Sequence, residues 1–314
     1  MRVLGLDTSN YTTSCAVFDG AGGVNRGRIL DVRPGELGLR QSDALFQHVQ
    51  RLPGLLGALA EETSLEALGA VGASTRPRAV EGSYMPCFLA GASQGQSLAH
   101  VLGVPFYAFS HQQGHLAAAA WSAGRMDLLD RPFLAWHLSG GTTELLRAEP
   151  EEDGMAVRAE ILGGTTDISA GQLIDRTGVL LGLQFPAGKS LDALSGEADA
   201  PMKYRVKRDG LRFSLSGMEN QVKKLLADSE KPANIARFTI DTVTDVILRT
   251  TRAAQEAYPG LPVLCSGGVA SNRRLRGALE EGCGAVFAQP QYAADNAMGT
   301  AILTWRALER EAGR

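Results

Sequence analysis

The stretch 133-FLAWHLSGGTTELLRA-148 indicates how the chain folds. Its apolar run 133–138 predicts a buried strand, the small, hydroxyl-rich run 139–143 predicts a turn, and 144–148 predicts a returning strand. The backbone N–H groups and hydroxyls of such a turn are suited to bind a phosphate. On its own the pattern is also that of an ordinary hairpin.

The same arrangement occurs near the start of the chain. Residues 3–7 predict a strand ending in a carboxylate, and 15–18 predict a second strand after the turn 8–14. A third strand is expected within 27–32. Two such units, each followed by helices, form a loose internal repeat, which predicts a duplicated α/β architecture with a cleft between two lobes. Sugar kinases, actin and Hsp70 proteins fold in this way and hold nucleotide phosphates between two such loops.

Apolar periodicity predicts the remaining elements of both halves. The pair Gly267-Gly268 links a strand to a helix, where a nucleotide can approach the backbone and the helix N-terminus favours anions. We expect one lobe from residues 1–124 with 290–314, and the other from 125–289 with an inserted basic segment at about 185–232. Helices are expected at 42–63, 89–102, 111–121, 167–181, 232–257, 273–281 and 296–310, strands at 67–74, 105–109, 262–266 and 285–287, and loops at 75–84, 185–192 and 289–294.

The composition is that of a globular protein. With 314 residues, 44% hydrophobic and 21% charged, the chain has material for about two domains. No apolar run approaches the roughly 18 residues needed to cross a bilayer, and a strand begins at once, so we expect no membrane association and no signal peptide. Four cysteines without a C-x-x-C pair predict reduced thiols in a cytoplasm.

The net charge of −3 gives no general attraction for nucleic acid, so RNA contact requires a local basic patch. Residues 202–213 (MKYRVKRDGLRF) supply one, with Tyr204 and Phe213 interleaved among cations. Cations neutralise phosphates and aromatic rings stack on exposed bases. A solvated basic loop fits the pattern equally well. The candidate RNA contacts are Lys203, Arg205, Lys207, Arg208 and Arg212.

The sequence 111-HQQGH-115 places two imidazoles four residues apart, on one face of a helix that Ser110 is suited to cap. Neutral imidazole is the commonest protein ligand of transition metals. A helix cap and a core histidine would give the same sequence. Asp295, at a loop-to-helix junction, is the candidate third ligand, although an N-cap aspartate there is also ordinary. Two imidazoles and one carboxylate suit iron or zinc. Gln112 stands where a zincin protease has glutamate, which disfavours peptide hydrolysis.

The chain contains, in order, His111/His115, Ser139-Gly140-Gly141, Asp175, Gly188, 267-GGVASN-272 and Asp295-Asn296. In this order the motifs resemble those of the TsaD family (formerly O-sialoglycoprotein endopeptidases, peptidase M22), and the resemblance runs from Met1 to about Ile302. TsaD proteins are the catalytic subunits of tRNA threonylcarbamoyladenosine synthase. The resemblance implies an actin-like fold and transfer of threonylcarbamoyl from its adenylate to the adenosine beside the anticodon of tRNAs that read A-starting codons.

The resemblance also implies ligands and partners. It implies one divalent metal (iron, zinc or magnesium) on His111, His115 and Asp295, and an adenine nucleotide (ATP, ADP or acyl-AMP). The implied partners are the adenylate substrate, tRNA and a related actin-like subunit. The candidate nucleotide and substrate contacts, which include the glycine pair, are His137, Leu138, Ser139, Gly140, Gly141, Asp175, Gly188, Asp192, Gly267, Gly268 and Asn272.

The chain departs from the family pattern in its loops. The family usually reads E-T-S-C-D-E-T after the first strand; here 7-DTSNYTT-13 has Tyr11 and Thr12 in place of an acidic pair. The family's Gly-Pro-Gly loop is Arg76-Pro77-Arg78, and its Ser-Gly-Gly-His-Thr is 139-SGGTT-143. Loss of an acid/base group lowers a rate by about 10²–10⁴-fold. We expect a divergent paralogue that is a transferase, the alternatives being a non-catalytic regulator that binds nucleotide and metal, or an actin-like phosphotransferase. The candidate catalytic residues are Asp7, Ser9, Tyr11 and Thr12.

Overall fold

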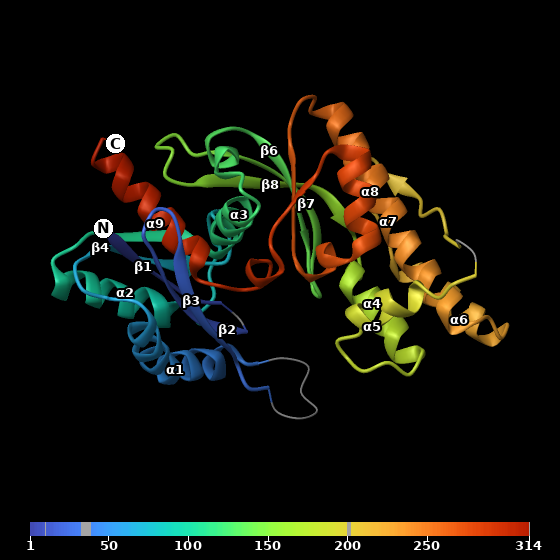
Figure 1. Cartoon of the computed structure of the whole chain (residues 1–314), viewed down its shortest axis with the longest axis horizontal. Coiled ribbons are helices and arrows are strands. Elements are labelled where there is room, and N and C mark those ends of the chain that lie inside the picture. The colour runs from blue at the N-terminus through green and yellow to red at the C-terminus, as the bar shows by residue number, and fades with distance from the viewer. Residues whose placement is uncertain (10, 33–38, 200–201, 314) are drawn as a thin grey trace. The chain divides into compact units, whose positions relative to one another are not determined.

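The computed structural model describes residues 1–9, 11–32, 39–199 and 202–313 (Figure 1). Asn10 of the expected first turn and residues 200–201 of the expected basic segment therefore lie outside the described residues. The lobe boundaries expected from the sequence stay a proposal. The chain divides into two compact units, Met1–Arg131 with Glu149–Ala159 and Gln291–Arg314, and Pro132–Ala148 with Glu160–Pro290.

The first unit is built on a five-stranded sheet in the order β3-β2-β1-β4-β5. The central strand β1 (Arg2–Thr8) is antiparallel to β2 (Thr12–Phe18) and parallel to β4 (Leu68–Arg76). Gly5 of β1 has no room for a side chain, because a Cβ there would overlap the backbone of Ala301, so the C-terminal helix lies directly on this strand. The other elements are β3 (Gly23–Ile29), α1 (Gln41–Glu62), α2 (Phe88–Leu102), β5 (Phe106–Ser110), α3 (His111–Ser122), the 3-10 turns η1 (Met126–Asp130) and η3 (Pro290–Tyr292), and α9 (Met298–Glu311).

The second unit is built on a seven-stranded sheet in the order β12-β11-β6-β7-β8-β10-β9. Its strand β6 (Phe133–Leu138) is antiparallel to β7 (Thr143–Pro150) and parallel to β11 (Val263–Ser266). The long helix α7 (Pro232–Ala257) buries an apolar face in the core around this sheet. The other elements are β8 (Val157–Thr165), α4 (Ala170–Leu180), α5 (Gly188–Ser195), β9 (Arg208–Asp209), β10 (Arg212–Phe213), α6 (Ser216–Ala227), the 3-10 turn η2 (Gly268–Ser271), α8 (Arg273–Cys283) and β12 (Val286–Phe287).

The two sheets repeat one strand order. In the first unit the strands run third, second, first, fourth, fifth in chain order, and the run β8-β7-β6-β11-β12 of the second unit has the same order. In both units an antiparallel pair is followed by parallel neighbours on the other side of the first strand. The duplication predicted from the two strand–turn–strand stretches is therefore confirmed in the topology.

Several expected elements begin or end elsewhere. The first strand–turn–strand has a shorter turn, because β2 begins at Thr12, and the third strand covers Gly23–Ile29 instead of lying within 27–32. The loop expected at 185–192 is wrong in its second half, where α5 begins at Gly188. Strand β8 and helix α6 lie where the sequence predicted no element.

The final helix also begins later than predicted. The sequence placed its start at Asn296 with Asp295 as the cap, but α9 begins at Met298. The side-chain oxygen of Asn296 accepts a hydrogen bond from the Met298 N–H at 3.1 Å, so Asn296 satisfies the free N–H at the helix start. Asp295 is thereby left outside the helix. Among the described residues, none of the helices combines the length and apolar character that crossing a membrane requires.

Candidate functional site

Helix α3 of the first unit presents the two histidines. The Ser110 hydroxyl accepts a hydrogen bond from the Gln113 N–H, and the Gln113 side chain accepts one from the Ser110 N–H. This reciprocal cap fixes the first turn directly after β5. His111 and His115 then lie on one face of the helix, with their Nε2 atoms 2.9 Å apart.

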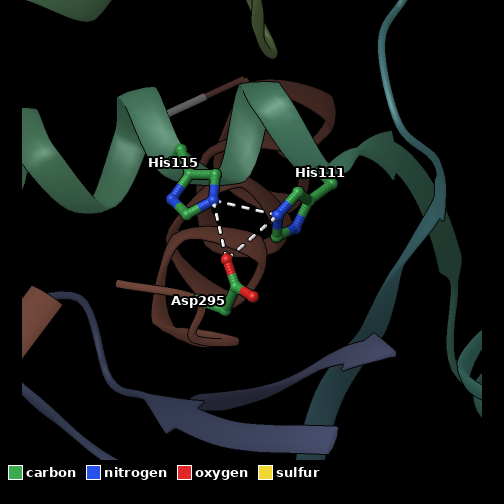
Figure 2. Close-up of side chains that lie close together, drawn as sticks. All are labelled: His111, His115 and Asp295. Atoms are coloured by element: carbon green, nitrogen blue, oxygen red, sulfur yellow. Dashed lines mark hydrogen bonds and ion pairs between the residues drawn. The ribbon is translucent and has the colours of Figure 1, made fainter. Parts of the chain in front are cut away.

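Asp295 meets both rings from the segment that precedes α9 (Figure 2). Its Oδ1 lies 3.4 Å from His111 Nε2 and 3.3 Å from His115 Nε2. A close helix crossing makes this approach possible: a Cβ on Gly299 of α9 would overlap the carbonyl oxygen of Gly114, which lies between the two histidines. Two glycines at the crossing therefore bring together residues that lie 180 or more positions apart in the sequence.

The three atoms fit three ligand positions around one cation. Donor atoms held about 2.0–2.2 Å from a Zn²⁺-sized ion in a tetrahedral site are separated by about 3.3–3.6 Å. The edges found here are 2.9–3.4 Å, so small side-chain shifts suffice to admit the ion. In the part of the chain that the structure describes, this is the group of histidine, cysteine and acidic side chains that meets the geometry of a metal site. The side chains of His111, His115 and Asp295 are 19%, 11% and 30% exposed, so solvent reaches the cluster.

Asp7 lies behind His111, away from the cluster. Its Oδ2 is 2.8 Å from His111 Nδ1. Burial lowers the pKa of His111, but the neighbouring carboxylates of Asp7 and Asp295 outweigh it and raise that pKa to about 10. Burial raises the pKa of Asp295, but the two histidines hold it well below its usual range. Without a cation, His111 is therefore protonated, and its positive charge lies between the carboxylates of Asp7 and Asp295.

The other candidate catalytic residues lie between β1 and β2 or at the start of β2. Ser9 is only 2% exposed, and its Oγ has no hydrogen-bond partner among the described residues. Thr12 is buried at the first position of β2. Tyr11 is 44% exposed, so it is the one of these side chains that solvent reaches freely.

The second unit contains a cavity of about 470 Å³, within the usual range for small-molecule sites. Two of the residues that line it are glycines, Gly140 after β6 and Gly268 after β11. A Cβ added at either position would meet no atom within 4 Å. Packing therefore does not require glycine at either position, and the space that a Cβ would fill is open to a ligand. The lining residues are Gly140, Gly171, Ile174, Asp175, Pro186, Gly188, Lys189, Asp192, Ile240, Gly268, Val269, Ser271, Asn272 and Arg273.

Hydrogen bonds fix the polar wall of this cavity. The Ala187 N–H donates to Asp175 Oδ1 at 2.8 Å, which ties α4 to the start of α5. The Asn272 amide donates to Asp192 Oδ1 at 2.8 Å, while the Asn272 Oδ1 caps α8 by accepting from two backbone N–H groups. No hydrogen bond from the described residues reaches the second oxygen of Asp175, so this oxygen is available for a hydroxyl group of a ligand. Pro186 and three branched aliphatic residues form the apolar part.

The cavity includes six of the eleven residues that the sequence suggested for nucleotide or substrate contact, namely Gly140, Asp175, Gly188, Asp192, Gly268 and Asn272. The other five do not line it. Leu138 is fully buried, His137 is half-buried on β6, and Ser139 closes the β6–β7 turn by accepting from the Thr142 N–H. Gly141 lies in the same turn, and Gly267 packs on the backbone of Leu138 with φ +96°.

Sequence reasoning missed several lining residues, including the cations Lys189 and Arg273. A signal existed for Arg273, which directly follows the candidate residue Asn272. Gly171 and Ile240 gave none, because only the packing of α4 and α7 brings them to the cavity.

The basic segment 202–213 is only partly available for a partner. Lys203 pairs with Asp245 at 2.8 Å, and the half-buried Arg208 donates to the Arg249 carbonyl. Phe213 belongs to the core at 3% exposure, so it cannot stack on a base, whereas Tyr204 is 42% exposed. The remaining cations Arg205, Lys207 and Arg212 are exposed.

Solved structures share the fold of the chain at low identity. Component A of the (R)-2-hydroxyglutaryl-CoA dehydratase from Acidaminococcus fermentans is 16% identical over 98% of this chain and 99% of its own, with a TM-score of 0.57. The activator of the 2-hydroxyisocaproyl-CoA dehydratase from Clostridium difficile, with bound ADPNP, is 13% identical over 100% and 97% (TM-score 0.55). The ROK hexokinase from Thermus thermophilus is 13% identical over 98% and 99% (TM-score 0.54). At such identities the likeness shows the fold alone, and it confirms the predicted duplicated actin-like α/β fold.

A family model identifies the relationship more closely. The model described as TsaD, tRNA N6-adenosine threonylcarbamoyltransferase, matches residues 38–302. The match covers most of both units, including His111, His115 and Asp295 and the whole lining of the cavity. The chain therefore belongs to the TsaD family.

Proposed function

We propose that the protein transfers a threonylcarbamoyl-type acyl group from an adenylate to an adenosine of tRNA. The observation that carries the proposal is the His111–His115–Asp295 cluster. Its atoms have the spacing of a metal site, and the chain that holds it belongs to the TsaD family. Iron and zinc suit two imidazoles and a carboxylate better than magnesium does, since magnesium prefers oxygen ligands. A cation bound there would act as a Lewis acid toward an oxygen of the substrate.

We propose that the cavity of the second unit binds the adenine nucleotide. Its apolar residues offer a surface for the base, and the free oxygen of Asp175 is placed to accept a hydrogen bond from a ribose hydroxyl. The open space at Gly140 and Gly268 lets a ligand approach the backbone. ATP, ADP and acyl-AMP share this nucleoside part. The activator that shares the fold was solved with bound ADPNP, which supports an adenine nucleotide in this chain too.

The proposed reaction is an acyl transfer. The N6 amine of the adenosine attacks the carbonyl carbon of the threonylcarbamoyl group, a C–N bond forms, the C–O bond to the phosphate breaks, and AMP leaves. The amine proton passes to solvent or to the departing phosphate, because Tyr11 and Thr12 offer no carboxylate to accept it. The exposed Arg205, Lys207 and Arg212 are the proposed contacts for tRNA phosphates. As the family pattern implies, a related actin-like subunit is a proposed partner.

A second candidate is a regulator that binds nucleotide and metal without transfer. Tyr11 and Thr12 favour it, because they replace the carboxylates of the family pattern. A phosphotransferase has only the hexokinase fold in its support, and fold alone does not specify function. Proteolysis by a zincin mechanism would need a glutamate at position 112, where the chain has Gln112.

The test is an acyl-transfer assay with threonylcarbamoyl-adenylate and tRNA, with and without a related actin-like subunit, followed by mass spectrometry of the nucleosides. We expect modified adenosine from the wild type and none from His115→Ala. A Tyr11→Asp/Thr12→Glu variant should be faster than wild type by up to about 10²-fold if those positions limit proton transfer. If the wild type binds nucleotide and metal but modifies no adenosine, and only the restored variant does, the regulator is correct and the transferase is wrong.

A further inference from the structure

The carboxylate of Asp7 is fully used within the protein. Asp7 is 1% exposed on the central strand β1. Its Oδ1 accepts a hydrogen bond from the Ser9 N–H at 3.1 Å, and its Oδ2 lies 2.8 Å from His111 Nδ1. A side chain this buried and this committed does not contact a substrate, so its effect must pass through His111.

The two nitrogens of an imidazole are not equivalent once one has a partner. A carboxylate at Nδ1 holds the proton there, which leaves the lone pair of Nε2 free to bind a cation. In this protein the Nε2 of His111 is the atom that faces His115 and Asp295. The ring also packs against Phe88, with ring centroids 6.0 Å apart, so its plane is held on a second side.

We propose that Asp7 is a positioning residue of the metal centre: it fixes the tautomer and orientation of His111 so that Nε2 is presented to the cation. The inference rests on the proposed metal centre and revises the expectation that Asp7 is a catalytic group. It also assigns a role to Asp7, the one acidic residue of the stretch 7–13, in which Tyr11 and Thr12 stand where the family pattern has acidic residues.

A purely structural role for Asp7 gives a different result. A buried carboxylate that only supports β1 would affect stability, but it would not affect the affinity of the folded protein for a cation. Thr8 is the matched control, because it is equally buried on the same strand and its hydroxyl makes two hydrogen bonds, to the Cys87 carbonyl at 3.0 Å and from the Gly91 N–H at 3.1 Å. Thr8→Val removes both bonds without altering the cluster.

The experiment titrates wild type, Asp7→Asn, Asp7→Glu, Thr8→Val and His115→Ala with Co²⁺, followed by the d–d absorption of the bound ion. Affinities are measured over a range of pH and fitted to a pH-independent value, because Asp7 also stabilises the proton that competes with the cation. Asp7→Asn should bind about 10–100-fold more weakly, which is the usual effect of losing the partner of a ligating histidine. Asp7→Glu should recover part of the loss, and Thr8→Val should match the wild type.

Equal affinity of folded Asp7→Asn and wild type would overturn the inference and leave the proposed metal centre intact. Failure of the wild type to bind Co²⁺, or unchanged binding by His115→Ala, would overturn both. Nitrogen-15 spectra of the wild-type histidines with Zn²⁺ bound give an answer that needs no variant. The inference requires a proton on Nδ1 of His111 and the metal on Nε2, and the reverse assignment refutes it.

Discussion

Raising the pH should strengthen cation binding at the His111–His115–Asp295 cluster by a predictable amount. A cation binds only neutral imidazole, so it must displace the proton that His111 holds in the metal-free protein. Asp295 contributes no proton, because its pKa is held well below the usual range and it is already ionised. His111 therefore releases one proton for each cation bound at neutral pH.

The magnitude follows from the pKa of His111, which the two flanking carboxylates raise to about 10 despite burial. At about pH 7 the ring is protonated in all but roughly one molecule in 10³, so the competing proton weakens binding by about 4 kcal/mol. The apparent association constant should rise about tenfold per pH unit, or roughly 100-fold between about pH 7 and pH 9.

The assay is competition with a chromophoric chelator at several pH values, together with calorimetry in buffers of different ionisation enthalpy. The buffer dependence should give a release of about one proton per Zn²⁺ near pH 8. An affinity that does not change with pH over this range would refute the reasoning, because it would mean that no proton bridges His111 and its carboxylates. His111→Ala is the control, since it removes the proton together with the ligand.

The geometry of the cluster and of the cavity leads to three further predictions. The pKa of His111 is raised from 6.5 in the unfolded chain to about 10 in the folded protein. The metal-free protein should therefore lose stability as the pH rises through this window, by at most about 1.4 kcal/mol per pH unit in urea unfolding. A free energy of unfolding that does not change with pH would count against the ion pairs of His111 with Asp7 and Asp295. Gly299→Ala should lower the free energy of unfolding by about 1–3 kcal/mol and weaken Co²⁺ binding, because its Cβ would overlap the Gly114 carbonyl; an unchanged melting temperature would contradict the close crossing. In the second unit, Gly268→Ala should leave the free energy of unfolding unchanged within about 0.5 kcal/mol and should weaken ATP binding in calorimetry. Gly171→Ala should lower the free energy of unfolding by about 1–3 kcal/mol, because its Cβ would meet the backbone of the β6–β7 turn. Equal effects of the two variants would refute the assignment of the cavity.

Local patterns predicted the elements whose signals are long or unambiguous. Helix α7 begins and ends at the predicted residues, because its apolar positions repeat at helical spacing over 26 residues and Pro232 opens its first turn. Strand β6 likewise matches the predicted strand. The sequence predicts a loop where helix α5 forms, because Pro186 and Gly188 signal a turn and a helix of only 8 residues depends on tertiary packing.

The candidate site was only partly visible in the sequence. The spacing of His111 and His115 is a local property of one helix turn, so it could be predicted. Asp295 could be named as a candidate, but its approach depends on a crossing of two helices that no local pattern encodes. The position of Asp7 behind His111 could not be foreseen, because the strand pairing of β1 and β4 sets it.

The central claim, a single cation held by His111, His115 and Asp295, is tested most directly by anomalous diffraction. Crystals grown with Zn²⁺ and measured on both sides of the zinc absorption edge will show where the ion binds. The account predicts one anomalous peak about 2.0–2.2 Å from the two Nε2 atoms and Oδ1 of Asp295. Zinc peaks elsewhere in the crystal with none at this cluster would contradict it.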